Sequence, residues 1–130
     1  MKWILHNLGT CSIEETLESI KKYQTGIIVV DARDIPDDKC SGEDFERLKK
    51  HIVIVSLLRK RGYRVLVRCH AGISRSNSIA IAVIMLDHKM IFEDALDLVK
   101  TKIPEANPHP ELLDNIKDAV KEIGIQRVES

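Results

Sequence analysis

Residues 67–76 read Val67-Arg68-Cys69-His70-Ala71-Gly72-Ile73-Ser74-Arg75-Ser76. The apolar run that ends at Val67 is typical of a buried strand, and the apolar run that begins after Asn77 is long enough for a helix. A strand, a tight loop and a helix N-terminus in that order direct unpaired backbone N–H groups and the helix dipole at one point. This segment therefore predicts a loop that binds an anion.

Two side chains in this loop add chemistry to anion binding. Cys69 supplies a nucleophile, because converging N–H dipoles and a nearby cation stabilise a thiolate. Arg75 suits bidentate contact with two phosphoryl oxygens. Gly72 lets the backbone approach the anion closely, and the Ser76 hydroxyl is placed to stabilise the sulfur when it leaves. A buried cysteine is more often a small core residue, but the flanking residues favour hydrolysis of a phosphate ester through a cysteinyl-phosphate.

The run from Cys69 to Leu86 resembles the signature loop and following helix of the dual-specificity protein phosphatases. These enzymes belong to the cysteine-dependent protein tyrosine phosphatase superfamily. The later segments Glu93-Asp94-Ala95, Asn107-Pro108 and Leu112-Leu113 are also similar to that family. The resemblance implies catalytic roles for Cys69, Arg75 and Ser76. It also implies a substrate-binding loop made of Cys69, His70, Ala71, Gly72, Ile73, Ser74 and Arg75.

One position departs from the family pattern. The family usually has histidine directly before the nucleophile, where it helps to hold the loop, and this chain has Arg68 there, with His70 after the cysteine. Arginine keeps a positive charge nearby but cannot form the hydrogen bonds of a neutral imidazole. Arg68 therefore affects the turnover rate that we expect, while the expected reaction, hydrolysis of a phosphate ester, stays the same.

Cleavage of the ester also needs an acid that protonates the leaving oxygen. In the family this acid is an aspartate on a loop well before the cysteine, and residues 27–38 of this chain contain four aspartates. Asp34 closes the strand-like part of this segment, and Phe45 follows at the spacing that the family shows before its helix-opening aromatic residue. We therefore expect Asp34 to be the general acid.

The other three aspartates remain alternatives. Asp37 is the second candidate, because its separation from Cys69 also suits the family, and Asp38 is the third. Asp31 lies within the strand pattern, so we expect it to brace the loop. An aspartate of this segment that has no catalytic role is expected to be a solvated loop carboxylate.

Length and composition restrict the class of protein. The chain has 130 residues, 44% of them hydrophobic, which suits one catalytic domain over 1–130. Its 20 basic and 20 acidic residues give a net charge of zero, which argues against a nucleic-acid partner. No run reaches the roughly eighteen apolar residues that a membrane span needs. We expect a monomer that binds phosphorylated proteins or peptides and neither membrane nor nucleic acid.

Cysteine usage points to a reducing compartment. Cys11, Cys40 and Cys69 have neither metal-ligand spacing nor an even disulfide framework, so we expect no metal and no cofactor. A nucleophilic thiol and an N-terminus without a secretory signal predict a cytoplasmic protein. Cys40 is either an incidental loop cysteine or, as with a neighbouring thiol in some family members, a reversible disulfide partner that protects Cys69.

The pattern of apolar residues predicts an α/β fold with a central, mostly parallel sheet of four to five strands flanked by helices, like the protein tyrosine phosphatases. Strands are expected at about Trp3–Leu5, at Ile27–Val30 as a fully buried strand, and at Arg64–Arg68. The last of these delivers Cys69 to the carboxyl edge of the sheet, where open α/β sheets bind ligands.

Helices alternate with these strands. Ser12 with Glu15 forms a capping box that opens a helix with Ile13, Leu17 and Ile20 on its core face. A second cap at Ser41 with Asp44 opens a helix that ends at Lys60-Arg61-Gly62. The apolar helix after Arg75 should be buried at the centre, and two more helices are expected over Phe92–Lys102 and Glu111–Ile123, the latter with Pro110 in its first turn.

The substrate class rests on the loop residues and on the charge. His70 and Ile73 stand where relatives that act on inositol lipids carry basic residues, and the net charge is zero. These features favour phosphotyrosine together with phosphoserine and phosphothreonine esters in proteins. The alternatives are a phosphatase of RNA 5′-phosphates or inositol phosphates on the same fold, and a phosphate-binding module without catalysis. Asn107-Pro108 is either a segment that orders the pocket or a simple turn before a helix.

Overall fold

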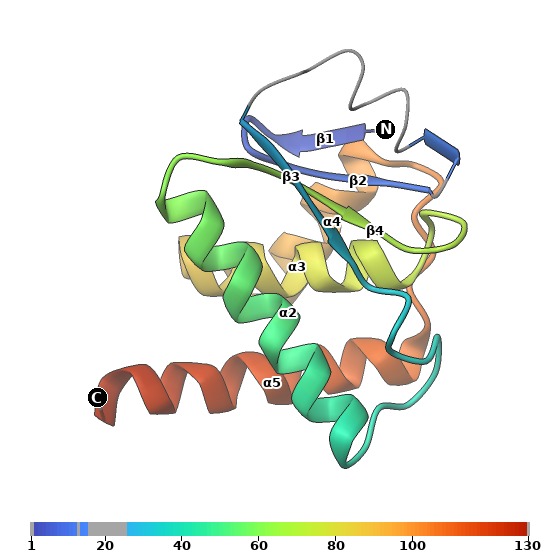
Figure 1. Ribbon diagram of the computed structural model, residues 1–130. Coiled ribbons are helices and arrows are strands. Elements are labelled where there is room, and N and C mark those ends of the chain that lie inside the picture. Colours follow the sequence, from blue (N-terminus) through green and yellow to red (C-terminus); the bar gives the residue numbers. More distant parts are fainter. Residues whose placement is uncertain (1, 13, 16–25, 130) are drawn as a thin grey trace.

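A four-stranded mixed sheet forms the upper layer of the protein in Figure 1, a computed structural model that describes residues 2–12, 14–15 and 26–129. Its strands are β1 (Lys2–Leu5), β2 (Leu8–Cys11), β3 (Ile27–Asp31) and β4 (Arg64–Arg68). They lie in the order β1-β2-β4-β3, with β1 antiparallel to β2 and the other pairs parallel. The expected mostly parallel sheet is confirmed, and β1 and β4 lie where the sequence predicted strands.

The strand β2 was not expected from the sequence, because Leu-Gly-Thr-Cys is too short to show an alternating pattern. Gly9 is needed there, since a Cβ at this position would lie 2.7 Å from the Lys2 carbonyl oxygen and 2.8 Å from the Trp3 ring. The prediction that residues 27–30 are fully buried was wrong. Only Val30 is buried, because β3 is an edge strand that pairs with β4 alone.

Four helices within residues 26–129 accompany the sheet: α2 (Glu43–Lys60), α3 (Arg75–His88), α4 (Phe92–Lys102) and α5 (Pro110–Glu129). Figure 1 shows α2, α3 and α5 on one side of the sheet. The helix α3 contacts β2 and β4 above it and packs against α2, α4 and α5. Residues 79–84 of α3 are completely buried, which confirms the expected central helix. None of the described helices is both long and apolar enough to cross a membrane.

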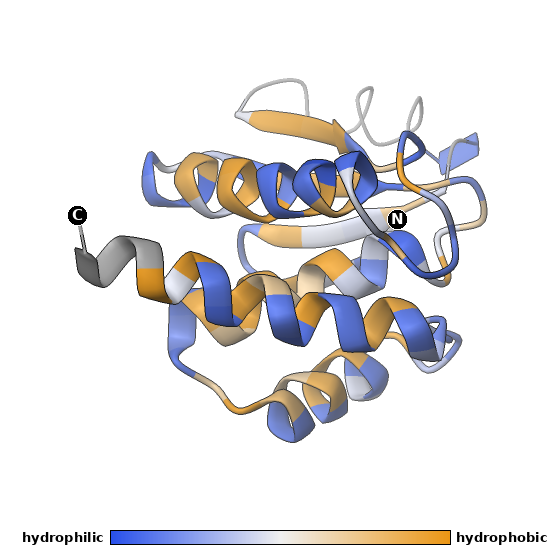
Figure 2. Cartoon of the chain, turned by 90° about the horizontal axis from the view of Figure 1, so that it is seen from below, coloured by the Kyte–Doolittle hydropathy of each residue, from blue (hydrophilic) through white to orange (hydrophobic). Residues whose placement is uncertain are grey.

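The helix boundaries follow the sequence with two exceptions. The helix α2 begins at Glu43 after Gly42, and the expected Ser41 side-chain cap was wrong. Gly42 adopts a left-handed conformation with a φ of 57°, and the Ser41 backbone carbonyl, in place of its hydroxyl, accepts the N–H of Asp44. The helix α5 runs beyond the expected end at Ile123. Its alternating apolar and polar turns are visible across the front of Figure 2.

The expected capping box at Ser12 is present. The backbone N–H of Ser12 donates to Glu15 Oε1 at 3.0 Å, and the backbone N–H of Glu15 donates to Ser12 Oγ at 3.3 Å. The predicted core positions of the helix that would follow, Ile13, Leu17 and Ile20, lie outside the described residues.

Candidate active site

The carboxyl edge of the sheet carries the loop that follows β4. Parallel pairing places Cys11 of β2 and Asp31 of β3 beside Arg68, the last residue of β4. The chain then turns through residues 69–74 and enters α3 at Arg75, with Ser74 as the N-cap residue. The strand, loop and helix predicted from residues 67–76 therefore form, and their order places the loop amides near the helix N-terminus.

The loop is held in shape from several sides. Gly72 has a φ of 73°, and a Cβ there would lie 3.0 Å from the backbone nitrogen of Ser12, so only glycine fits without strain. The Asn77 side-chain amide donates to the carbonyl oxygens of Gly72 at 3.1 Å and Ile73 at 2.8 Å. The backbone N–H of Asn107 donates to the same Ile73 oxygen at 3.0 Å. These contacts fix the loop before any anion binds.

Asn77 was missed in the sequence analysis, although a signal was present. It is a fully buried polar residue in the first turn of an otherwise apolar helix. A buried amide needs hydrogen-bond partners, and the nearest unpaired backbone groups belong to the preceding loop. Asn107 contributes its backbone N–H to the same loop and is also one of the residues that line the cavity at this edge of the sheet.

The nucleophile candidate lies at the base of this loop. Cys69 is only 2% exposed, and its Sγ lies 3.3 Å from Ser76 Oγ in a hydrogen bond. It opens on a cavity of about 340 Å³. The residues that line the cavity are Asp37, Cys69, His70, Ala71, Ile73, Ser74, Arg75 and Asn107. The thiol and the guanidinium therefore share one space, as the anion-loop interpretation requires.

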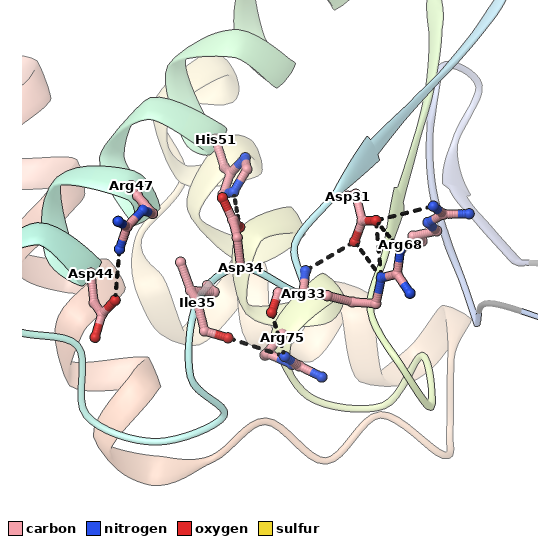
Figure 3. Close-up of polar contacts among 9 residues, drawn as sticks. All are labelled: Asp31, Arg33, Asp34, Ile35, Asp44, Arg47, His51, Arg68 and Arg75. Carbon is pink, nitrogen blue, oxygen red and sulfur yellow. Dashed lines mark hydrogen bonds and ion pairs between the residues drawn. The ribbon is translucent and has the colours of Figure 1, made fainter.

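Arg75 connects this loop to the segment after β3. Its Nη1 donates to the carbonyl oxygens of Ile35 at 3.0 Å and Arg33 at 3.3 Å, contacts that Figure 3 shows. Among the described residues, its Nε and Nη2 have no hydrogen-bond partner. Two nitrogens of the guanidinium are therefore left for the oxygens of a bound anion.

The four aspartates of residues 27–38 have separate environments. Asp34 pairs with His51 (Figure 3), with Oδ1 at 2.6 Å from Nε2. The Asp34 side chain is 52% exposed, and Asp34 does not line the cavity. Asp37 lines the cavity together with Cys69. Asp38 is exposed, with Oδ1 at 3.8 Å from His109 Nε2. The geometry thus places Asp37 at the cavity that Cys69 also lines, whereas it leaves the expected acid, Asp34, outside the cavity.

Asp31 and Arg68 form an ion-pair cluster with Arg33 (Figure 3). Asp31 Oδ2 accepts from Arg33 Nη2 at 2.6 Å and from Arg68 Nη2 at 3.0 Å. The hydrogen bonds from Arg33, reinforced by Arg68, hold the pKa of Asp31 well below its usual range. Asp31 is therefore an ionised brace at the sheet edge. Arg68, which stands in place of the family histidine, is directed to this brace and does not line the cavity.

Cys40 has a structural environment of its own. Its backbone N–H donates to Asn115 Oδ1 at 2.7 Å, and its carbonyl accepts from Asn115 Nδ2 at 2.9 Å. Burial, together with the nearby carboxylates of Asp44 and Asp38, raises the pKa of the Cys40 thiol to about 11. A thiol that stays protonated is a poor partner for disulfide exchange. Cys40 does not line the cavity, and the protective disulfide with Cys69 stays a prediction.

Comparisons with known proteins cover most of the chain. Residues 5–122 match the family model described as the dual specificity phosphatase catalytic domain. The MAP kinase phosphatase with leucine-rich repeats protein 3 of Dictyostelium discoideum is 36% identical over 113 residues, which is 87% of this chain and 12% of that protein. Dual specificity protein phosphatase 12 of Mus musculus is 38% identical over 69 residues, 53% of this chain and 20% of that protein. The chain spans about an eighth and a fifth of these relatives' lengths.

Solved structures show the same architecture. The crystal structure of human DUSP28 matches with a TM-score of 0.78 at 18% identity, covering 97% of this chain and 99% of that chain. The crystal structure of a mouse putative dual specificity phosphatase complexed with zinc tungstate matches with a TM-score of 0.79 at 17% identity, covering 98% of this chain and 90% of that chain. These likenesses establish the fold that the sequence predicted.

Proposed function

Because this chain belongs to the dual specificity phosphatase family, we propose that it hydrolyses phosphate monoesters of protein side chains through a phosphocysteine on Cys69. One observation carries the proposal. Cys69, Arg75 and Asp37 line a single cavity at the carboxyl edge of the sheet. These three side chains supply a nucleophile, a bidentate anion ligand and a proton donor, which are the groups that transfer of a phosphoryl group to a thiol requires.

The reaction has two steps. The Cys69 thiolate attacks phosphorus, an S–P bond forms, and the P–O bond to the leaving group breaks while Asp37 donates a proton to the departing oxygen. A water molecule then attacks the phosphorus, Asp37 accepts the proton from that water, and the S–P bond breaks to release phosphate. The Ser76 hydroxyl, 3.3 Å from Sγ, stabilises the sulfur as it leaves.

The anion is held by the loop and by Arg75. Backbone N–H groups of residues 70–75 and the N-terminus of α3 bind the phosphoryl oxygens, whereas the N–H of Cys69 donates to the Cys11 carbonyl at 3.4 Å. His70, Ala71, Gly72, Ile73 and Ser74 form the loop. Arg75 contributes Nε and Nη2, which have no partner among the described residues, to two equatorial oxygens. These contacts strengthen as charge redistributes in the transition state.

We assign the general acid to Asp37 in place of Asp34. Asp37 shares the cavity with Cys69, whereas Asp34 pairs with His51 on a largely exposed side chain outside it. An acid must come within hydrogen-bond reach of the leaving oxygen, and that oxygen lies above the sulfur in the cavity. Asp34 remains the alternative, and asparagine variants of the two residues distinguish between them.

The substrate class follows from the cavity wall and the net charge. Ile73 is 38% exposed and, with Ala71, gives the wall an apolar portion suited to a side chain that carries the ester. Arg75 is the only Lys or Arg among the described lining residues, so the cavity offers little to a second phosphate group. A protein phosphoester with one phosphate fits better than an inositol phosphate or an RNA end. A cytoplasmic location is part of the proposal, because the nucleophile needs a reducing environment.

A panel of substrates tests this function. The purified chain should release phosphate from phosphotyrosine, phosphoserine and phosphothreonine peptides, with the phosphotyrosine peptide fastest because phenoxide leaves more easily. Phosphate release from inositol phosphates and from RNA 5′-phosphates should be at least about tenfold slower in kcat/KM, since one guanidinium serves one phosphoryl group. A higher kcat/KM on inositol phosphates or RNA 5′-phosphates than on the phosphopeptides would assign the protein to that substrate class.

Replacement of Arg75 tests the anion-binding role. Arg75→Lys keeps the charge but loses the bidentate fork and the contacts to the carbonyls of Arg33 and Ile35. We expect kcat/KM on an aryl phosphate to fall about 10²-fold, with weaker inhibition by inorganic phosphate. Arg61→Lys, at an exposed position beyond α2, is the matched control and should behave as wild type. Unchanged inhibition by phosphate in Arg75→Lys would contradict the role.

A further inference from the structure

The Ser74 hydroxyl lies between two segments that are distant in sequence. Its Oγ donates to Asp37 Oδ1 at 2.5 Å, and it accepts the backbone N–H of His109 at 2.9 Å. Ser74 is 8% exposed, so solvent has little access to this hydroxyl. The residue that precedes Arg75 therefore links the nucleophile loop to the loop of the proposed acid and to the segment before α5.

The direction of these hydrogen bonds is determined by chemistry. A backbone N–H can only donate, so the contact with His109 occupies a lone pair of the Ser74 oxygen. The single hydroxyl proton is then directed to Asp37 Oδ1. Among the described residues, Ser74 is the only hydrogen-bond partner of Asp37, and Oδ2 has none. One carboxyl oxygen is held and the other is left for the proton that the reaction uses.

From this geometry we propose that Ser74 is a positioning residue, which holds Asp37 Oδ1 so that Oδ2 carries the transferred proton toward the leaving oxygen. The inference rests on the proposed function, in which Asp37 is the general acid. A carboxyl group without this contact turns about its own C–C bond and presents either oxygen to the cavity. The bond to Ser74 removes that freedom before substrate binds, which favours a productive geometry.

The backbone of Ser74 is held independently of its side chain. Its carbonyl oxygen accepts two hydrogen bonds from Ser78, one from the backbone N–H at 2.9 Å and one from Oγ at 2.9 Å. Loss of the Ser74 hydroxyl therefore leaves these contacts in place. The buried Ser78 hydroxyl contacts the same residue but has no bond to Asp37, which makes Ser78→Ala a matched control.

The test compares two aryl phosphates, one with a good and one with a poor leaving group. Proton donation matters for the poor leaving group and little for the good one. Ser74→Ala should lower kcat about tenfold on the poor substrate. Its kcat on the good substrate and its inhibition by inorganic phosphate should change by less than about twofold. Ser74→Thr, which keeps a hydroxyl, should restore activity on the poor substrate, and Ser74→Cys, a weak donor of similar size, should reproduce the loss.

Three results would overturn the inference. The first is a kcat that falls equally on both substrates in Ser74→Ala and Ser74→Cys. The second is a fall of kcat in Ser78→Ala that is confined to the poor substrate, and the third is a further fall of kcat when Ser74→Ala is added to Asp37→Ala. If Asp37→Ala itself retains activity on the poor substrate, the proposed acid fails and this inference fails with it. If Asp37→Ala loses that activity and the Ser74 variants do not, only the positioning role is refuted.

Discussion

Cys69→Ser should abolish turnover while the cavity still binds an oxyanion. A serine hydroxyl is not ionised at neutral pH, so the S–P bond has no equivalent, and kcat on an aryl phosphate should fall about 10⁴-fold or more. The loop amides and Arg75 do not depend on the sulfur. Calorimetric titration with inorganic phosphate should therefore give an affinity at least equal to that of the wild type.

This variant also separates an enzyme from a binding module. A non-catalytic phosphate-binding protein would show the same negligible turnover before and after the substitution. Cys40→Ser is the control for removal of a thiol, because Cys40 lies outside the cavity and its pKa is raised to about 11. It should keep wild-type turnover. Activity of Cys69→Ser close to that of the wild type would refute the covalent mechanism.

Asp37→Asn should slow hydrolysis of esters with poor leaving groups by about 10²-fold or more, because an amide has no proton to donate to the departing oxygen. Hydrolysis of an ester with a good leaving group should change much less, because its departing oxygen needs little help from a proton. The measurement is kcat at one pH on two aryl phosphates that differ in the acidity of the leaving phenol.

Asp34→Asn is the matched comparison, since it makes the same change three residues earlier in the segment. Its carboxylate pairs with His51 outside the cavity, and an exposed pair of this kind contributes little to stability. We expect a kcat within about twofold of wild type on both aryl phosphates. Should Asp34→Asn slow hydrolysis of the poor substrate while Asp37→Asn does not, the assignment would return to Asp34.

The loop of residues 69–75 was predictable because its information is local. Cys69, Gly72 and Arg75 lie within seven residues of chain, and the apolar patterns on both sides identify a strand and a helix. The elements β4 and α4 form at the predicted bounds, since their signals are also local. Single-domain organisation over 1–130, a monomeric state and the cytoplasmic location remain predictions.

The acid could not be chosen from the sequence because the choice depends on a turn of the chain. Asp34 and Asp37 are three residues apart on a segment without regular structure, and both suit the family spacing. Hydrogen bonds from Arg75 to the carbonyls of residues 33 and 35 set the path of this segment. That path directs Asp34 to α2 and Asp37 to the cavity. Neither contact is visible in a sequence pattern.

By itself the sequence predicted the loop with Cys69 and Arg75, the strand before it and the helix after it, since residues close in the chain remain close in any fold. Only the tertiary structure decided which aspartate lines the cavity together with Cys69, what Arg68 binds, and that Ser74 joins three segments. The contacts of Arg68 and Ser74 span 35 to 37 residues of chain. They arise because parallel pairing of β3 with β4 brings both loops to one edge of the sheet.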